Sequence, residues 1–215
     1  MSLREALEAR RARGKQSFDA ERSAVYGAQA DALAASDILE TALRTDDRAP
    51  DFTLPDHRGN AVSFSGLLVD GPVVLSFYRG SWCPFCNLEL RALQAALADA
   101  EAAGVTLVAL SPNTPDTSLE LVNVAELTFP VLSDVGSEVA AAFNLVYEMA
   151  PEQEAYYRKI NRDVGAMNGS ERWLLPVPAT YVIDRERTIR YHFVDLNHRV
   201  RAEPSEVIEV AARFV

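Results

Sequence analysis

A strand that runs directly into two cysteines constrains the fold of this 215-residue chain more than any other feature. Residues 73–78 (VVLSFY) have the continuous apolar character of a buried strand, and the loop RGSWCPFC follows at once over residues 79–86. Leucines then recur at helical spacing up to Gly104, a residue type that commonly ends a helix. The predicted order is therefore strand, loop and helix, with Cys83 at the first helical turn.

The position of Cys83 predicts a reactive thiol. The first turn of a helix presents unpaired N–H groups and the positive end of the helix dipole, and both stabilise a thiolate. In such a place, and in a Cys-x-x-Cys arrangement, a thiol pKa can fall from ~8.5 into the range of about 3.5 to 7.5. Cys86 lies deeper on the same helix face, so a Cys83–Cys86 redox disulfide is within reach. We expect Cys83 to be the nucleophile and Cys86 the resolving thiol.

Two other interpretations of the cysteines stay open. Free cysteines are often small buried hydrophobic residues without chemistry. The pair could also be half of a metal site, but structural zinc takes four Cys or His ligands. The chain offers only three scattered histidines, His57, His192 and His198. We therefore expect no metal at the cysteines.

Other residues of the loop are candidates for the same site. Arg79 would place a positive charge near the thiolate or a peroxide oxygen, unless it is simply solvated at the end of the strand. Trp82 would form a docking surface for a partner, cap the core, or do both. Tyr78 is a weaker candidate for a substrate pocket, because a tyrosine also suits the end of a buried strand.

The rest of the chain is organised around this unit. Residues 1–45 are rich in Ala, Glu, Arg and Leu and lack proline, which predicts an N-terminal helical extension with sparse apolar positions, Phe18 among them. From residue 46 to 215, strands and helices alternate, which predicts a mainly parallel sheet covered by helices. Residues 147–173 are mixed and polar, and we expect an irregular insertion on the active-site side. Strands are predicted at 73–78, 105–110, 129–132, 176–183 and 189–194, a hairpin at 52–64, and helices at 118–127, 137–143 and 205–214.

Composition excludes several classes of function. Lys plus Arg number 21 against 31 Asp plus Glu, a formal net charge of −10, so the phosphate-neutralising charge of a nucleic-acid binder is absent. The longest apolar runs fall far short of the ~20 residues that a membrane-spanning helix needs. Charges close to Met1 do not fit a signal peptide, and two cysteines cannot form a disulfide framework. We expect a cytoplasmic protein that binds neither nucleic acid nor membranes.

Three motifs, in the order found in a known family, narrow the fold. They are residues 49–56 (APDFTLPD), residues 77–86 (FYRGSWCPFC) and residues 178–184 (PATYVID). Over residues 46–214 the chain resembles the thioredoxin-fold redoxins, and more narrowly a peroxiredoxin-like member of the alkyl hydroperoxide reductase and thiol-specific antioxidant family. The resemblance implies an α/β thioredoxin-like fold, with a central mixed sheet flanked by helices, an active-site cysteine at Cys83, and a cis-proline facing it at Pro178.

The chain departs from the family pattern beside Cys83. Ser76 and Gly80 stand where typical members carry a proline and a threonine or serine, so the hydroxyl that would orient peroxide is missing. Ser81 is the adjacent candidate to substitute for it. A second family arginine is replaced by Pro178, and Arg201 is a candidate to supply its charge. These changes make the loop more similar to that of thioredoxin.

The resemblance implies a thiol-dependent peroxidase that reduces peroxides through Cys83 and Cys86 and is recycled by a thioredoxin-like electron donor. A thiol-disulfide oxidoreductase acting on protein disulfides is the second hypothesis, and a non-catalytic interaction module is the third. The chain contains no Gly-x-Gly-x-x-Gly or phosphate loop, so no cofactor is expected. The N-terminal helices are candidates to form a homodimer.

Overall fold

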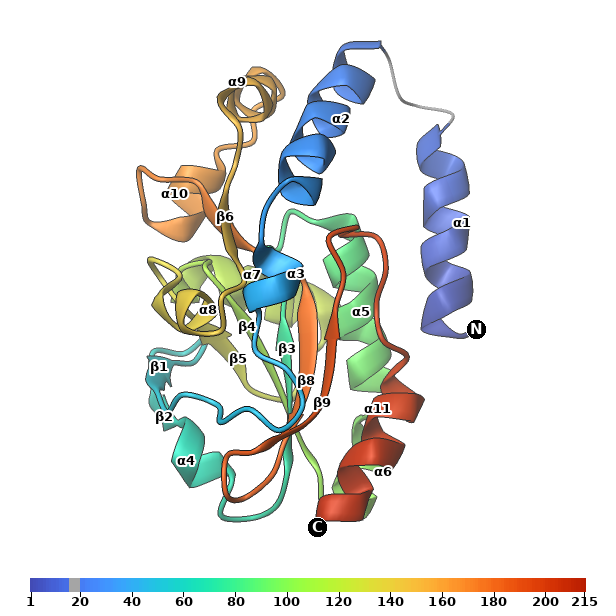
Figure 1. Cartoon of the computed structure of the whole chain (residues 1–215), viewed down its shortest axis with the longest axis vertical. Helices are drawn as coiled ribbons and strands as arrows, with labels where there is room; N and C mark the ends of the chain where they lie inside the picture. The colour runs from blue at the N-terminus through green and yellow to red at the C-terminus, as the bar shows by residue number, and fades with distance from the viewer. Residues whose placement is uncertain (16–19) are drawn as a thin grey trace.

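A five-stranded mixed sheet forms the centre of the molecule (Figure 1). The computed structural model describes residues 1–15 and 20–215, so Phe18 lies outside the described residues. The strand order is β5-β4-β3-β8-β9, and two smaller sheets, β1-β2 and β6-β7, lie outside it. The strands are β1 (Thr53–Pro55), β2 (Ala61–Ser63), β3 (Val73–Phe77), β4 (Thr106–Ser111), β5 (Val131–Ser133), β6 (Val146–Glu148), β7 (Leu174–Pro176), β8 (Ala179–Ile183) and β9 (Ile189–Val194).

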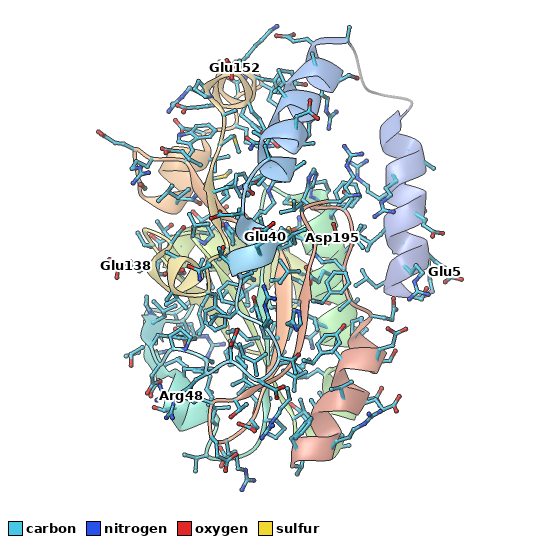
Figure 2. The ribbon with its side chains drawn as sticks, viewed as in Figure 1. Glu5, Glu40, Arg48, Glu138, Glu152 and Asp195 are labelled. Atoms are coloured by element: carbon cyan, nitrogen blue, oxygen red, sulfur yellow. The ribbon has the colours of Figure 1, made fainter. Side chains whose placement is uncertain are left out.

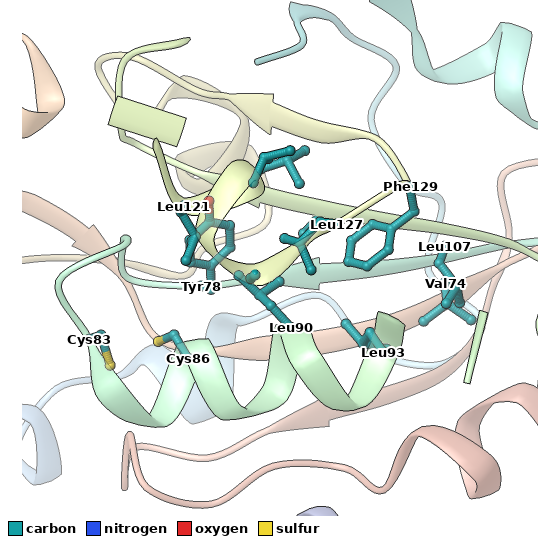
Figure 3. Close-up of a cluster of buried hydrophobic side chains, with 14 of the residues drawn as sticks. Val74, Tyr78, Cys83, Cys86, Leu90, Leu93, Leu107, Leu121, Leu127 and Phe129 are labelled. Atoms are coloured by element: carbon teal, nitrogen blue, oxygen red, sulfur yellow. The ribbon is translucent and has the colours of Figure 1, made fainter. Parts of the chain in front are cut away.

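Helices cover both faces of the central sheet (Figure 1). They are α1 (Leu3–Lys15), α2 (Ala20–Ala34), α3 (Ile38–Thr41), α4 (Phe64–Leu67), α5 (Pro84–Ala95), α6 (Leu97–Ala102), α7 (Pro115–Ala125), α8 (Glu138–Ala142), α9 (Pro151–Lys159), α10 (Val164–Asn168), α11 (Pro204–Ala211) and the short 3-10 helix η1 (Ala212–Phe214). Side chains of β3 alternate between the faces. Val74 joins a buried cluster with α5, α7 and α11, whereas Leu75 and Phe77 join a second cluster with α4 and α8. Figure 3 shows the first cluster, which contains both cysteines.

The central sheet is half parallel and half antiparallel. Strand β3 pairs in parallel with β4, and β4 with β5, as the alternation of strands and helices predicts. Strands β8 and β9 form a hairpin and run antiparallel, so that Phe77 faces Ala179 across the β3–β8 pair. The thioredoxin-like mixed sheet is therefore confirmed, while the expectation of a mainly parallel sheet overlooked the contribution of this hairpin.

Two elements that the sequence predicts as continuous are divided in the structure, and one segment predicted as irregular contains helices. The helix after Cys83 is divided at Ala96, where the backbone ψ of 0° is no longer helical. The predicted strand 176–183 is also divided, because β7 belongs to the sheet with β6 and β8 to the central sheet. The segment 147–173 is not irregular: it contains helices α9 and α10 between the paired strands β6 and β7. The hairpin β1-β2 has Gly59 in its turn with a φ of 83°.

The N-terminal residues pack against three parts of the fold: helix α5, helix α9 and strand β9. Leu3 and Leu7 of α1 are buried, and α1 lies against α5. Helix α2 lies against α9. Residues 45–49 then follow the outer edge of β9, where the Asp46 N–H donates to the Ile189 carbonyl at 2.8 Å and the Ile189 N–H donates to Asp47 at 2.9 Å. In the same stretch Arg48 forms an isolated bridge with Thr188.

At the opposite edge of the central sheet, a second isolated bridge joins Asp56 to Leu132 of β5. Both outer strands thus carry backbone from outside the sheet along part of their length. Within residues 1–15 and 20–215, no helix is long and apolar enough to cross a membrane.

Candidate functional site

Cys83 and Cys86 lie at the start of α5, at the end of the loop that follows β3 (Figure 3). Cys83 is the N-cap residue with an extended backbone, and Pro84 occupies the first helical turn, where its missing N–H costs nothing. Both thiols are free and buried. The strand, loop and helix order predicted from the sequence is confirmed, and it places the two cysteines one helical turn apart.

The two thiols have opposite electrostatic tendencies. Burial by itself would raise the pKa of Cys83, but a hydrogen bond with Cys86 and the positive charges of Arg79 and Arg201 outweigh it and hold this pKa well below its usual value. Burial raises the pKa of Cys86, and the hydrogen bond and negative charge of Cys83 raise it further. The arrangement therefore favours a Cys83 thiolate beside a protonated Cys86.

A buried ion pair lies beside Cys86. The Nη2 atom of Arg201 lies 3.2 Å from Cys86 Sγ, and its Nε atom pairs with Glu89. Ser76 donates to the other oxygen of Glu89 at 3.1 Å. The remaining donor of Arg201, Nη1, reaches the carbonyls of His198 and Val200 at 2.8 and 2.6 Å. Arg201 was a sequence candidate of unknown distance, and the structure brings it to the resolving cysteine.

Glu89 is a member of this group that the sequence reasoning missed. Burial raises its pKa, whereas Arg201 and Ser76 lower it, and the net direction is upward. A signal was present: Glu89 lies three residues after Cys86, on the face of α5 that also buries Leu90 and Leu93. An acidic residue on an otherwise apolar helix face indicates a buried partner of opposite charge.

Arg79 and Trp82, both in the loop before Cys83, pack against each other. The guanidinium of Arg79 lies 4.8 Å from the centre of the Trp82 ring, and Arg79 is only 2% exposed. Its Nε atom has no hydrogen-bond partner among residues 1–15 and 20–215. Gly80 permits this packing, because its φ is 135° and an added Cβ would lie 2.6 Å from Trp82 Nε1.

A chain of side-chain amides holds the loop in place. Asn113 accepts a hydrogen bond from the Ser81 N–H at 2.8 Å and donates to Asn168 of α10 at 2.8 Å. Asn87 of α5 donates to the Ser81 carbonyl at 2.9 Å. The backbone of Ser81, rather than its hydroxyl, is thus the part that these contacts hold. The sequence reasoning did not identify Asn113 or Asn168, since neither lies near the cysteines in the chain.

A pocket of about 370 Å³ opens over Cys83. Its walls come from α1, α2, the start of α5, the α9 region and the loop before Arg201. The described residues that line it are Arg10, Arg11, Gly14, Arg22, Tyr26, Arg79, Trp82, Cys83, Pro84, Phe85, Asn87, Tyr156, Tyr157, Ile160, Arg162, His198 and Arg199.

The segment 147–173 lies on the active-site side, as its place in the chain predicts. The ring of Tyr157 meets the Trp82 ring edge-on with centroids 5.4 Å apart. The hydroxyls of Tyr157 and Tyr26 lie 2.6 Å apart, which joins α9 to the N-terminal helix α2. Tyr26 also lies 6.2 Å from His198, centroid to centroid. The wall of the pocket is therefore built from distant parts of the chain.

The predicted pocket residues divide into two groups. Arg79, Trp82 and Cys83 line the pocket, whereas Tyr78, Ser81 and Pro178 are not among its described lining residues. Tyr78 lies in the core beside the cysteines (Figure 3), where burial raises its pKa to about 12. Its hydroxyl therefore stays protonated at neutral pH.

The expectation of a cis peptide bond before Pro178 is wrong, since no cis bond occurs in the part of the chain that the structure describes. Pro178 lies in extended chain between β7 and β8, after a residue whose N–H donates to the Leu145 carbonyl. A trans bond carries the chain directly from one sheet into the other. Among the described residues, no group of three His, Cys, Asp or Glu side chains could hold a metal ion.

Known proteins resemble this chain in sequence and in fold. A Mycobacterium tuberculosis protein described as a peroxiredoxin is 36% identical over 103 residues, which cover 48% of this chain and 65% of that protein. The thiol-disulfide oxidoreductase ResA of Geobacillus kaustophilus is 32% identical over 109 residues, 49% of this chain and 60% of its own length. The chain thus spans less than two thirds of these relatives.

The crystal structure of the peroxidoxin BcpB from Mycobacterium tuberculosis superposes with a TM-score of 0.63 at 23% identity, covering 80% of this chain and 99% of that one. This likeness shows a shared fold. The sequence model of the AhpC/TSA family matches residues 45–192 of this chain. The match covers more than half of the chain and includes both cysteines. With its strand, loop and helix arrangement around Cys83, this protein therefore belongs to the AhpC/TSA family.

Proposed function

We propose that this protein is a thiol-dependent peroxidase of the peroxiredoxin type. The observation that carries the proposal is that Cys83 and Arg79 line the same pocket and that Cys83 is hydrogen-bonded to Cys86. Two positive charges favour the thiolate, which is the nucleophilic form of cysteine. The same charges favour the anion that leaves when a peroxide bond breaks.

The reaction begins when the Cys83 thiolate attacks one oxygen of a hydroperoxide ROOH. An S–O bond forms, the O–O bond breaks, and RO⁻ leaves and takes a proton to become the alcohol ROH. Cys83 is then a sulfenic acid. Arg79 lines the pocket, its positive charge acts on Cys83, and it would stabilise the departing oxygen. It therefore takes the place of the hydroxyl that Gly80 lacks.

Cys86 completes the oxidative half of the cycle. Its thiol loses a proton and attacks the Cys83 sulfur, water leaves, and a Cys83–Cys86 disulfide forms. A dithiol donor of the thioredoxin type returns both cysteines to the thiol state and is itself oxidised to a disulfide. We propose that this cycle runs in the cytoplasm, where such donors keep thiols reduced.

We also propose that the protein assembles into a homodimer. Sedimentation of the full chain would test this assembly.

Stoichiometric oxidation tests the proposed function. Fully reduced protein is mixed with one equivalent of hydrogen peroxide, and Cys83 oxidation is followed by quenching and mass spectrometry. We expect oxidation much faster than that of free cysteine at the same thiolate fraction, followed by disulfide formation. Cys86→Ser should stop at a sulfenic acid that dimedone traps, and Cys83→Ser should not react. A wild-type rate no greater than that of free cysteine would refute the proposal.

Exchange with protein disulfides is the second candidate function. The Cys-Pro-Phe-Cys sequence and the resemblance to ResA favour it. The burial of Cys83 at 1% exposure argues against it, because a protein disulfide must bring its sulfur into contact with the nucleophile. Reduction of insulin by the reduced protein distinguishes the two functions: rapid insulin reduction with slow peroxide oxidation would favour exchange.

A further inference from the structure

The pocket over Cys83 has a charge opposite to that of the chain as a whole. The formal net charge is −10, yet six of the described lining residues are arginines and none is acidic. The arginines are Arg10, Arg11, Arg22, Arg79, Arg162 and Arg199. Among the acidic residues labelled in Figure 2, Glu5, Glu138 and Glu152 are exposed and lie at the periphery. Positive charge therefore lines the pocket that also contains Cys83, although the chain as a whole is acidic.

Four of these arginines lie over aromatic rings, and one of them, Arg22, is 5.6 Å from the centre of the Tyr26 ring. Arg10 lies 5.8 Å from the centre of the Phe85 ring, and Arg162 lies 5.5 Å from that of Tyr157. Arg79 has the same relation to Trp82 and keeps a buried Nε atom without a hydrogen-bond partner in the described chain. Arg10, Arg79 and Arg162 form no ion pair with an acidic residue in the described part of the chain. A guanidinium positioned on a ring retains N–H donors at its edge for a planar anion.

The charged walls lie largely outside the region that defines the family. Arg10 and Arg22 come from α1 and α2, and Arg199 follows β9, whereas the family match covers residues 45–192. Figure 1 shows the N-terminal helices beside the upper part of the sheet, next to α9 and α5. The family region thus supplies the thiols, and the flanking segments supply most of the cationic surface. Because the arginines come mostly from outside the family region, we infer that the pocket determines which substrates this protein accepts.

We propose that the pocket binds an organic hydroperoxide that carries a carboxylate. Its apolar body would lie against Trp82, Phe85 and Tyr157, and its peroxide would reach Cys83. Its carboxylate would pair with Arg10 and Arg162. The volume of about 370 Å³ is that of a small-molecule site. Arginine forks match carboxylates in geometry. This inference rests on the proposed function and names the class of substrate for the same site.

A matched pair of substrates tests the inference. Cumene hydroperoxide and its 4-carboxylate derivative differ by one carboxylate group, and each is used to oxidise the reduced protein in a single turnover. We expect the carboxylate derivative to react about tenfold faster at low ionic strength, an advantage that salt should reduce because it screens charges beyond ~10 Å at 0.1 M. The net charge of the whole chain would by itself repel the carboxylate derivative, so a faster reaction would point to the charge of the pocket.

Variants of two arginines locate the effect. Arg10→Gln and Arg162→Gln should each lower the rate ratio between the two hydroperoxides about threefold, the size expected of one partly exposed ion pair. Arg13→Gln on α1 and Arg172→Gln in the segment 147–173 remove the same charge outside the pocket and should leave the ratio unchanged. Unreactive 4-isopropylbenzoate, measured by calorimetry, should bind the wild-type protein and bind both pocket variants more weakly.

The outcomes separate this inference from the proposed function. Equal oxidation of Cys83 by both hydroperoxides, with no binding of 4-isopropylbenzoate, would overturn the substrate class and leave the peroxidase intact. Binding of 4-isopropylbenzoate without fast oxidation by either hydroperoxide would overturn both proposals. If charge discrimination appeared only when 4-mercaptobenzoate and thiophenol reduce the disulfide, the anion would be a reductant, and the assignment to a hydroperoxide would be wrong.

Discussion

Each of the two cysteines has a buried arginine nearby, but only one of these arginines is paired with a carboxylate. Beside Cys86, the buried Arg201 is paired with Glu89 and donates its other hydrogen bonds to backbone carbonyls. Over Cys83, the equally buried Arg79 has no carboxylate partner among the described residues. A paired charge holds structure together, whereas an unpaired buried charge is available to a thiolate or a ligand. Both charges favour the Cys83 thiolate, but Arg201 also has a structural carboxylate partner, whereas Arg79 does not.

The largest expected effect is on stability. Arg201→Met should destabilise the reduced protein by about 3–5 kcal/mol, because it leaves Glu89 buried without its partner. Arg79→Met should cost about 1 kcal/mol or less, since it removes an unpaired charge and introduces an apolar side chain. Urea denaturation of both variants measures the free energies of unfolding. Equal losses would show that the two arginines do not differ in the way proposed.

The second effect concerns reactivity. Arg79→Met should raise the pKa of Cys83 and slow its alkylation by iodoacetamide at pH 4 by about tenfold. This pH lies below the wild-type pKa of about 5, so there a rise of one pKa unit lowers the thiolate fraction about tenfold. The Cys86→Ser background removes the competing thiol. Arg79→Lys keeps the charge and serves as the control, with most of the wild-type rate retained. An unchanged profile for Arg79→Met would mean that Arg79 does not stabilise the thiolate.

The third effect is the pH dependence of stability. The pKa of Cys83 is lower in the folded state than the ~8.5 of an unfolded thiol, so its contribution to stability is complete above pH ~8.5 and is lost as pH falls through the folded pKa. The difference in unfolding free energy between wild type and Cys83→Ser should therefore grow as pH rises towards 8.5. Urea titrations at several pH values measure it, and a constant difference would contradict the lowered pKa.

The smallest effect distinguishes crowding from backbone strain. Gly80 and Gly59 both have positive φ, but a Cβ at Gly80 would meet Trp82, whereas one at Gly59 would meet nothing within 4 Å. Gly80→Ala should therefore lose about 1 kcal/mol more stability than Gly59→Ala. Urea denaturation compares the two variants. Equal losses would indicate that Trp82 moves away freely and does not position Arg79.

Local patterns allowed the centre of the site to be predicted. The apolar strand, the cysteine spacing and the leucine period all act over a few residues, so the order around Cys83 could be inferred from the sequence. The pairing of Glu89 with Arg201 joins residues 112 apart in the chain, and the Asn113–Asn168 contact joins residues 55 apart. Such contacts depend on the tertiary fold. The expectation of a cis bond at Pro178 came from the family resemblance alone. In the structure this bond is trans.

The backbone segments beside the outer strands of the sheet bear on how copies of this chain could associate. Open strand edges are templates for intermolecular sheet growth and aggregation. Residues 45–49 occupy the start of the β9 edge, and Asp56 occupies part of the β5 edge. A second molecule could extend the sheet there only by displacing these segments. At these two places, the fold itself therefore stops the sheet from growing beyond one subunit.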